Sequence, residues 1–233
     1  MNKNFSAMIL AAGFGSRMKP LTNNLPKPLL DINGITLLDN AINFLKLLGC
    51  DEIIVNSHYH HLKIRNLINK RKDKNIITLI YEKKILDTGG AVKNAIPYFK
   101  NKNILLINSD IFWQKENIND INKLITNYYK TIDPRILLVK KNDAFGISNS
   151  SGDFNLNKNL ISRFTQGNEI LFYTGLQMFN LNIFKKISKN KFSFNEVWDN
   201  LIINNKLFGQ IMNSNWYHVG DIHGLTIAKN LRS

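Results

Sequence analysis

The stretch AMILAAGFGSRMKPLTNNLPKPLL, residues 7–30, places a short apolar run directly before a loop with two glycines and several cations. The run AMILAA predicts a strand, and Gly13 and Gly15 follow it immediately. Glycines there allow backbone N–H groups to approach a phosphate closely, while Arg17 and Lys27 add positive charge. The stretch therefore indicates a strand that ends in an anion-binding loop.

Two familiar phosphate-binding motifs do not explain this loop. The dinucleotide fingerprint requires a third glycine where Met18 stands. The P-loop requires Gly-Lys-Ser or Gly-Lys-Thr, which the loop lacks. Another kind of phosphate chemistry must account for Arg17 and Lys27.

Outward from the loop, β-rich runs alternate with amphipathic segments, and the strands are apolar on both faces. This alternation is typical of an α/β fold with a mainly parallel sheet covered on both sides, whose ligands bind over the carboxyl ends of the strands. The Asn-, Ser- and Gly-rich run 143–159 predicts a turn or hairpin. The predicted strands cover residues 7–12, 52–57, 76–82, 104–110, 136–141 and 171–179, with a last one leading to 215–221, and the predicted helices cover 37–49, 61–71, 90–99, 118–130, 194–205 and 224–232.

The glycine loop resembles the signature of the sugar-phosphate nucleotidyltransferases, L-A-A-G-x-G-[ST]-R-[ML]-x-P-L-T followed by P-K-P-[LM], and fills every fixed position. The runs LDTGGAVKNA (86–95), LLINSD (105–110) and WYHVGD (216–221) resemble later segments of the family. The greatest likeness is to small bacterial N-acetylmuramate-1-phosphate uridylyltransferase-like enzymes. The resemblance implies a Rossmann-like nucleotidyltransferase fold, with a mixed, mostly parallel sheet flanked by helices and no β-helix domain. It implies one domain, 1–233, with a nucleotide-binding part at about 1–112 and a sugar-binding part at about 113–233.

The resemblance also implies an activity. A nucleoside triphosphate and a sugar 1-phosphate would give a nucleotide sugar and pyrophosphate, with Mg²⁺ as cofactor. UTP and N-acetylmuramate 1-phosphate, used in cell-wall recycling, are the first expectation for the substrates. Mannose-1-phosphate guanylyltransferases and phosphocholine cytidylyltransferases share the first loop, so base and acceptor stay open. A non-catalytic nucleotide-sugar sensor is the alternative from another class.

The implied catalytic residues are Arg17, Lys27 and Asp110. Arg17 would act on the triphosphate and leaving group, and Lys27 on the α-phosphate or the sugar phosphate. Asp110 ends an apolar strand, where a carboxylate has no packing role but can bind Mg²⁺. The implied nucleotide-binding residues are Leu10, Ala11, Ala12, Gly13, Gly15, Ser16, Arg17, Glu82, Thr88 and Gly89, and the implied substrate-binding residues are Lys27, Asn108, Asp153, Thr174 and Gly175. Thr88, Gly89 and Gly90 are expected to offer N–H donors to the base or ribose.

The C-terminal segment departs from the family pattern. Most relatives carry an aspartate that completes the metal site, whereas this chain has His218 at that position. Imidazole is a poor ligand for Mg²⁺, which prefers oxygen. Asp221, three residues later, is the alternative oxygen ligand, so the second metal ligand is His218 or Asp221.

Composition excludes several other classes of protein. The formal charge of +14 arises from 25 Lys and 6 Arg in a chain that is also rich in Asn and Ile, as an AT-biased coding sequence would produce, so we expect no nucleic-acid partner. Basic runs such as residues 70–74 are interpreted as solvated surface.

The apolar runs are too short for a bilayer span or signal peptide, so a cytoplasmic location without a membrane partner is expected. Cys50 is expected to be a buried thiol, and His58, His60 and His61 a surface loop rather than a zinc site.

Overall fold

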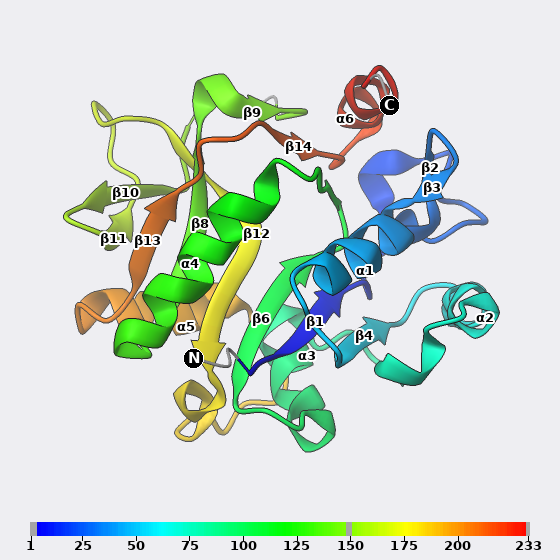
Figure 1. Ribbon diagram of the computed structural model, residues 1–233, viewed down its shortest axis with the longest axis horizontal. Helices are drawn as coiled ribbons and strands as arrows, with labels where there is room; N and C mark the ends of the chain where they lie inside the picture. Colours follow the sequence, from blue (N-terminus) through cyan, green and yellow to red (C-terminus); the bar gives the residue numbers. More distant parts are fainter. Residues whose placement is uncertain (1–3, 148–150, 232–233) are drawn as a thin grey trace.

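The computed structural model describes residues 4–147 and 151–231. A sheet of nine strands runs through the centre of the fold in the order β10-β11-β13-β8-β12-β6-β1-β4-β5 (Figure 1). Its strands are β1 (Ser6–Leu10), β4 (Ile53–Ser57), β5 (Ile77–Tyr81), β6 (Asn103–Asn108), β8 (Arg135–Lys140), β10 (Phe154–Asn157), β11 (Leu160–Arg163), β12 (Leu171–Asn180) and β13 (Phe208–Ile211). The α/β Rossmann-like fold expected from the sequence is confirmed.

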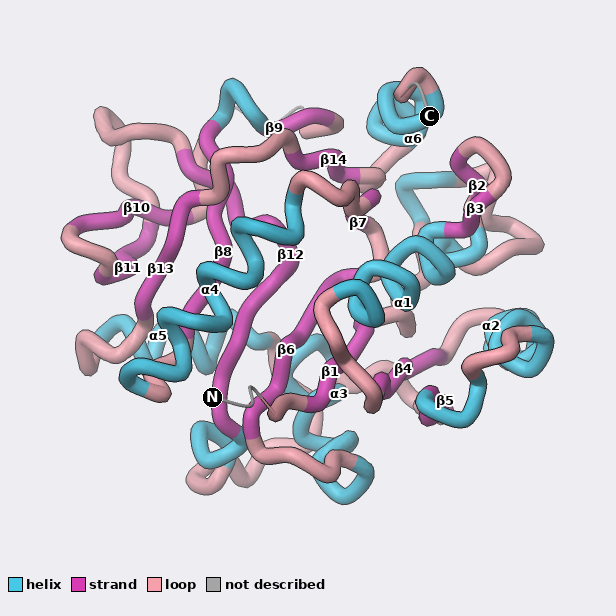
Figure 2. The backbone as a smooth tube through the Cα atoms, viewed as in Figure 1, coloured by secondary structure: helices cyan, strands magenta, loops and turns pink. Residues whose placement is uncertain are grey.

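Helices cover both faces of this sheet (Figure 2). Alternation along β1 shows why: Ala7 and Ile9 belong to one apolar core, while Met8 between them belongs to the other. The first core includes residues of α1 (Leu37–Leu47), α2 (His61–Lys70) and α4 (Asn117–Thr131); the second includes residues of α3 (Asp87–Ala95) and α5 (Phe194–Ile203). None of the helices in the described ranges has the length and apolar run needed to cross a membrane.

The two halves of the sheet differ in strand direction. Strands β6, β1, β4 and β5 are parallel, and β12 then runs antiparallel between β6 and β8. The far edge combines the antiparallel hairpin β10–β11 with a parallel β8–β13 pair. The mostly parallel character predicted from the sequence therefore applies to the first half, and the turn predicted within 143–159 falls partly on this hairpin and partly outside the described residues.

Two elements place the C-terminal segment over the main sheet. A small sheet of order β7-β14-β9 joins β7 (Ile111–Phe112), β14 (Trp216–His218) and β9 (Ala144–Phe145). Helix α6 (Ile222–Lys229) follows and packs near the hairpin of β2 (Asp31–Ile32) and β3 (Ile35–Thr36). The C-terminal segment thereby returns to the end of β6, where the sequence predicted a ligand site.

Candidate active site

The glycine loop is held in a closed shape by its own backbone. Gly15 has a φ of 65°, a left-handed conformation that favours glycine, and a Cβ there would lie 2.9 Å from Cβ of Lys27. Thr22 Oγ1 donates a hydrogen bond to the Gly15 carbonyl at 2.8 Å. The loop therefore folds back so that Lys27, which opens the short helix η2 (Lys27–Leu29), lies against its first turn.

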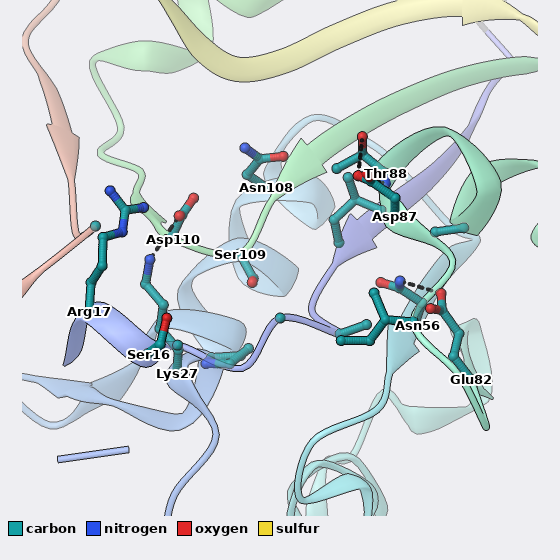
Figure 3. A pocket seen from close by; sticks show the side chains of 18 residues that line it. Ser16, Arg17, Lys27, Asn56, Glu82, Asp87, Thr88, Asn108, Ser109 and Asp110 are labelled. Carbon is teal, nitrogen blue, oxygen red and sulfur yellow. Dashed lines mark hydrogen bonds and ion pairs between the residues drawn. The ribbon is translucent and has the colours of Figure 1, made fainter. Parts of the chain in front are cut away.

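The loop forms one wall of a cavity of about 360 Å³ over the carboxyl ends of the parallel strands (Figure 3). Leu10, Asn56 and Asn108 lie side by side here because the registers of β4 and β6 against β1 align them. Figure 3 shows two polar groups of residues in the cavity, Arg17, Lys27 and Asp110 at one end and Asn56 with Glu82 at the other. Of the expected residues, those that line it are Leu10, Ala12, Gly13, Gly15, Ser16, Arg17, Lys27, Glu82, Thr88, Asn108 and Asp110.

Lys27 and Asp110 form an ion pair at the first end of the cavity. Lys27 Nζ donates a hydrogen bond to Asp110 Oδ2 at 2.8 Å, and both side chains are largely buried. Burial alone would raise the pKa of Asp110, but the charge of Lys27 and the contact with His218 outweigh it and hold that pKa well below its ordinary value. Asp110 is therefore a carboxylate across the physiological pH range.

Arg17 lies in the short helix η1 (Ser16–Met18) and borders the same end of the cavity. No carboxylate within residues 4–147 and 151–231 forms an ion pair with it, unlike Lys27. An exposed guanidinium beside a glycine loop offers several donors to a phosphate chain. The cavity therefore contains one unpaired cation and one paired cation at the same end.

The donor set near Asp110 fits a divalent cation. Asp110 Oδ1 is buried and accepts no hydrogen bond within the described chain. Mg²⁺ in proteins is commonly bound through one or two carboxylates, with water and substrate phosphates as its other ligands. Asp110 is accordingly the residue that would hold this ion.

His218 reaches Asp110 through the small sheet. Strand β14 pairs with β7 so that His218 lies opposite Ile111, and Val219 N donates to the Asp110 carbonyl at 2.8 Å. His218 Nε2 then lies 3.6 Å from Asp110 Oδ2, and its ring stacks on Trp216 with an interplanar angle of 8°. Of the two alternatives for the second metal ligand, His218 is the one in contact with Asp110.

Asp221 has a different role in the structure. Its carboxylate caps α6, because Oδ1 accepts a hydrogen bond from Gly224 N at 2.9 Å. The side chain lines an adjoining cavity and not the one that holds Asp110. As a metal ligand, Asp221 would have to share its carboxylate with this cap.

The other end of the cavity is a buried hydrogen-bonded chain. Ala11 N donates to Asn56 Oδ1 at 2.8 Å, and Asn56 Nδ2 donates to Glu82 Oε1 at 2.7 Å. Glu82 Oε2 accepts from Leu86 N at 3.2 Å, and only 3% of the residue is exposed. Glu82 is thus fixed between β4 and the start of α3, with its carboxylate at the cavity wall.

The N–H donors expected from Gly89 and Gly90 are already used within the protein. Both donate to the Phe192 carbonyl at 3.0 Å, and Thr88 Oγ1 accepts from Phe194 N at 2.8 Å. A Cβ on Gly89 would lie 2.4 Å from the Phe192 ring. The expectation that these glycine N–H groups face the nucleotide is corrected: the glycines allow α3 to pack against residues 192–194, and Thr88 alone of the three lines the cavity.

A second cavity of about 270 Å³ adjoins the first and shares Arg17 and Asn108 with it. Asp153 and Gly175 line this second cavity, as does Tyr173, whose pKa is raised well above its ordinary value by burial and by the charge of Asp110. The expected residues Ala11, Gly89 and Thr174 line neither cavity. Thr174 is fully buried and donates to the Leu137 carbonyl at 3.0 Å.

The three neighbouring histidines each contact a different group of the protein. His58 Nδ1 lies 2.7 Å from the Glu82 carbonyl, His60 Nε2 lies 3.1 Å from the Asn23 carbonyl, and His61 Nδ1 lies 2.8 Å from Ser57 Oγ. His58 and His61 therefore contact the ends of β5 and β4, and His60 contacts the glycine loop. Cys50 is a free, buried thiol, as predicted, and burial raises its pKa to about 11.

Asn56 and Tyr173 line the cavities although neither was predicted as a site residue, and Trp216 lies in the segment 216–221 but was assigned no role. Asn56 is the last residue but one of the predicted strand 52–57. The rule that ligands bind at the carboxyl ends of strands would therefore have identified it. Tyr173 carries no such signal. Both Tyr173 and Trp216 reach the second cavity because β12 and β14 pair with β6 and β7, and local sequence patterns do not reveal these pairings.

Comparison with known proteins agrees with this geometry. Residues 6–231 match the model of the protein family described as nucleotidyl transferase. It is 27% identical over 222 residues to the N-acetylmuramate alpha-1-phosphate uridylyltransferase of Caulobacter vibrioides, covering 92% of this chain and 91% of that protein. It is 32% identical to the D-glycero-alpha-D-manno-heptose 1-phosphate guanylyltransferase of Aneurinibacillus thermoaerophilus, over 45% of each chain.

Among solved structures, HddC from Yersinia pseudotuberculosis complexed with GMP-PN superposes with a TM-score of 0.78 at 23% identity, covering 97% of this chain and 98% of that one. A putative glucose-1-phosphate thymidylyltransferase from Bacillus anthracis gives a TM-score of 0.79 at 16% identity, covering 99% of this chain and 97% of that one. At these identities the superpositions establish the shared fold.

Proposed function

The chain belongs to the nucleotidyl transferase family, and from this premise we propose that it transfers the nucleotidyl group of UTP to N-acetylmuramate 1-phosphate. At the coarser level, it is a sugar-phosphate nucleotidyltransferase. The products are the nucleotide sugar and pyrophosphate. The proposal of these two substrates is supported by the likeness to the Caulobacter vibrioides enzyme, which extends over 92% of the chain.

One observation carries the two-substrate reaction: two cavities adjoin and share Arg17 and Asn108. The first cavity is lined by the glycine loop and by the carboxylate of Glu82, and this lining suits a nucleotide. The second has Asp153 and Gly175 and no glycine loop, which suits the sugar. Asp110 and Lys27 lie beside the residues common to both, where the α-phosphate of one substrate must meet the phosphate of the other.

The reaction is an in-line displacement at the α-phosphorus. An oxygen of the sugar phosphate forms a bond to that phosphorus, the bond to the bridging oxygen of the β-phosphate breaks, and pyrophosphate departs with the electron pair. The transfer needs positioning and charge compensation more than covalent catalysis. Arg17 binds the triphosphate and the leaving pyrophosphate. Lys27 binds the α-phosphate or the phosphate of the sugar.

Mg²⁺, when bound at Asp110, would offset phosphate charge at the reacting centre. His218 contributes indirectly in this proposal, by hydrogen bonding to a phosphate or to a water molecule, because its imidazole suits this ion poorly. We further propose that about 1–112 forms the nucleotide-binding part of one domain and about 113–233 the sugar-binding part. The reaction is placed in the cytoplasm, where nucleoside triphosphates are available, and within cell-wall recycling.

A substrate panel tests the proposal. The protein is incubated with Mg²⁺, each of the four common nucleoside triphosphates, and N-acetylmuramate 1-phosphate, N-acetylglucosamine 1-phosphate, mannose 1-phosphate or phosphocholine in turn, and pyrophosphate is measured. Fastest release with UTP and N-acetylmuramate 1-phosphate is the expected result. Fastest release with GTP and mannose 1-phosphate, or CTP and phosphocholine, overturns the choice of substrates. Binding of nucleotide sugar without any release of pyrophosphate would identify a sensor.

A further inference from the structure

A third cavity, of about 410 Å³, lies beside β13 and the start of β8. It is bounded by α4, the β10–β11 hairpin, β8 and β13, which lie together at one side of the fold (Figure 1). Arg135 begins β8 beside Met178, whose other neighbour is Leu105 near the start of β6. The cavity proposed for the nucleotide opens beyond Asn108, at the far end of β6, so the two sites lie at opposite ends of the strands.

The charge in this third cavity is all positive. Among the described residues, Lys123, Lys130 and Arg135 line it, and no carboxylate does. Lys130 Nζ makes one hydrogen bond, to Asn127 Oδ1 at 3.3 Å, and none of the three cations forms an ion pair with any residue the structure describes. Three cations without ion pairs around one cavity repel one another, and a bound anion would reduce that repulsion.

Arg135 contacts its neighbours without forming an ion pair with any described residue. Its Nε is buried and has no hydrogen-bond partner within the described chain, and Nη2 donates to Thr131 Oγ1 at 3.3 Å. The guanidinium carbon lies 5.1 Å from the centroid of the Phe208 ring, on the neighbouring strand. Burial lowers the pKa of Arg135, and the charge of Asp133 partly offsets this effect.

The other half-buried arginines among the described residues form ion pairs. Arg71 forms ion pairs with Asp39 and Asp73, and Arg163 forms one with Asp199. Arg17 lines the proposed triphosphate site. Like Arg135, it forms no ion pair with a carboxylate of the described residues. An arginine without a carboxylate at a cavity wall is therefore the arrangement that this chain uses where we place a phosphate.

The neutral part of the third cavity is built from fixed side chains. Asn127 Nδ2 donates to Gln210 Oε1 at 3.0 Å, and Gln210 Nε2 donates to the Asp120 carbonyl at 2.9 Å. Gln210 is only 8% exposed. These bonds fix two amide side chains in the wall of the cavity, beside the exposed Lys123 and Lys130, so part of the cavity is preorganised.

We propose that this cavity is a second anion site, which binds a small molecule bearing a phosphate or diphosphate through Arg135, Lys123 and Lys130. Guanidinium and ammonium groups around a concave polar surface are the chemistry that recognises phosphate. The site is independent of the proposed catalytic reaction. A free diphosphate and an organic phosphate monoester share this chemistry and are separated by the experiment.

Binding to the full chain is measured by calorimetry and by amide and arginine Nε–H nuclear magnetic resonance at about 0.15 M salt. Inorganic pyrophosphate and glucose 6-phosphate are the two probes, and the Arg17→Ala variant serves as background to weaken binding at the catalytic cavity. The expected result is saturable binding that shifts the signals of Arg135, Gly209 and Gln210. Saturation by pyrophosphate alone assigns a diphosphate ligand, and saturation by both probes assigns a monoester; each supports the site.

On the same background, Arg135→Gln and the double variant Lys123→Gln/Lys130→Gln should each weaken binding at least ~10-fold. Arg65→Gln and Lys72→Gln, which remove the same charges from exposed positions elsewhere, should leave binding unchanged. The double lysine variant carries the test if Arg135→Gln does not fold. Equal weakening in the control variants, no saturation by either probe, or binding of duplex DNA or RNA that the same variants abolish would overturn the proposal.

Discussion

Lys27 Nζ lies 2.8 Å from Asp110 Oδ2, although 83 positions separate the two residues. Lys27 is placed by the fold-back of the glycine loop, and Asp110 by the end of β6. A phosphate that enters the cavity competes with Asp110 for the Lys27 ammonium group. The pair therefore keeps both charges compensated before substrates bind, and it directs the cation to the position where the α-phosphate is proposed to react.

Arg17→Ala and Lys27→Ala should each lower kcat/KM for pyrophosphate formation by at least ~10²-fold, because charged contacts that strengthen in the transition state contribute about 3 kcal/mol. Lys19→Ala is the matched control, since Lys19 is exposed in the same loop and lines neither active-site cavity. Steady-state kinetics and circular dichroism of the three variants make the comparison. A folded Lys27→Ala protein with wild-type kinetics would remove Lys27 from the mechanism.

Asp110→Asn should abolish Mg²⁺-dependent activity, because a neutral amide binds this ion far more weakly than a carboxylate. His218→Asp should preserve or raise activity and sharpen the Mg²⁺ requirement, since it places a second carboxylate beside Asp110. Two neighbouring carboxylates repel each other, so His218→Asp should also unfold at a lower temperature without Mg²⁺ and recover when the ion is added. Activity titrations with Mg²⁺ and thermal unfolding with and without the ion provide both readouts. An active Asp110→Asn protein contradicts the proposed metal site.

Gly89→Ala should displace the start of α3, because the added methyl group would lie 2.4 Å from the Phe192 ring. Overpacking of this kind costs about 1–3 kcal/mol of unfolding free energy. The KM for the nucleoside triphosphate should rise more than the KM for the sugar phosphate, since Thr88 lines only the first cavity.

The double variant Gly89→Ala/Phe192→Leu should recover part of the nucleotide KM, with Phe192→Leu alone as the control. Urea denaturation and separate titrations of the two substrates measure these effects. If both KM values rise equally, the contact does not act through the nucleotide site.

Asp73→Asn should destabilise the fold at pH 7 by about 2 kcal/mol, because Asp73 accepts charge-assisted hydrogen bonds from Arg71 and Lys46. The hydrogen bond from Arg71 outweighs burial and holds the pKa of Asp73 below its ordinary value. Its stabilising contribution is therefore fully present above the unfolded pKa, near 4, and is lost as the pH falls through the folded pKa.

Urea denaturation of wild type and Asp73→Asn at pH 7, 5, 4 and 3 should show a stability difference that shrinks below about pH 4. Asp51→Asn, at an exposed position, is the matched control. A difference that stays constant down to pH 3 would contradict the assigned role of Asp73. This network also corrects the interpretation of residues 70–74 as solvated surface, because the side chain of Arg71 is only 12% exposed.

The periodic pattern of apolar residues predicts those helices and strands whose own sequence shows a clear helix or strand period. Strand β1, helix α1 and helix α4 were predicted to within two residues of their bounds, because each has an apolar pattern that matches its period. The pairing of β14 with β7 was not predictable in this way. Both strands are two or three residues long, and the contact between His218 and Asp110 depends on a return of the chain across more than a hundred positions.

The residues of the candidate site differ in the same way: some lie in one contiguous motif, and others come from distant parts of the chain. Gly15, Arg17 and Lys27 belong to one contiguous motif, so their convergence followed from sequence alone. The second cavity draws Asp153, Tyr173 and Asp221 from three separate elements, and only the folded chain brings them together. Thr174 shows the limit of motif transfer: it is the immediate neighbour of Gly175, yet its side chain points into the core, because alternate residues of a strand face opposite sides.

The most direct test of the central claim is ³¹P nuclear magnetic resonance of one mixture of the protein, UTP, N-acetylmuramate 1-phosphate and Mg²⁺. Signals of pyrophosphate and of the diphosphate of the nucleotide sugar are expected to grow in equal amounts, while those of UTP and the sugar phosphate decline together. Omitting the sugar phosphate should stop the reaction. Hydrolysis of UTP independent of the sugar phosphate, or unchanged spectra with every triphosphate and sugar phosphate of the panel, would contradict the assignment of this chain as a sugar-phosphate nucleotidyltransferase.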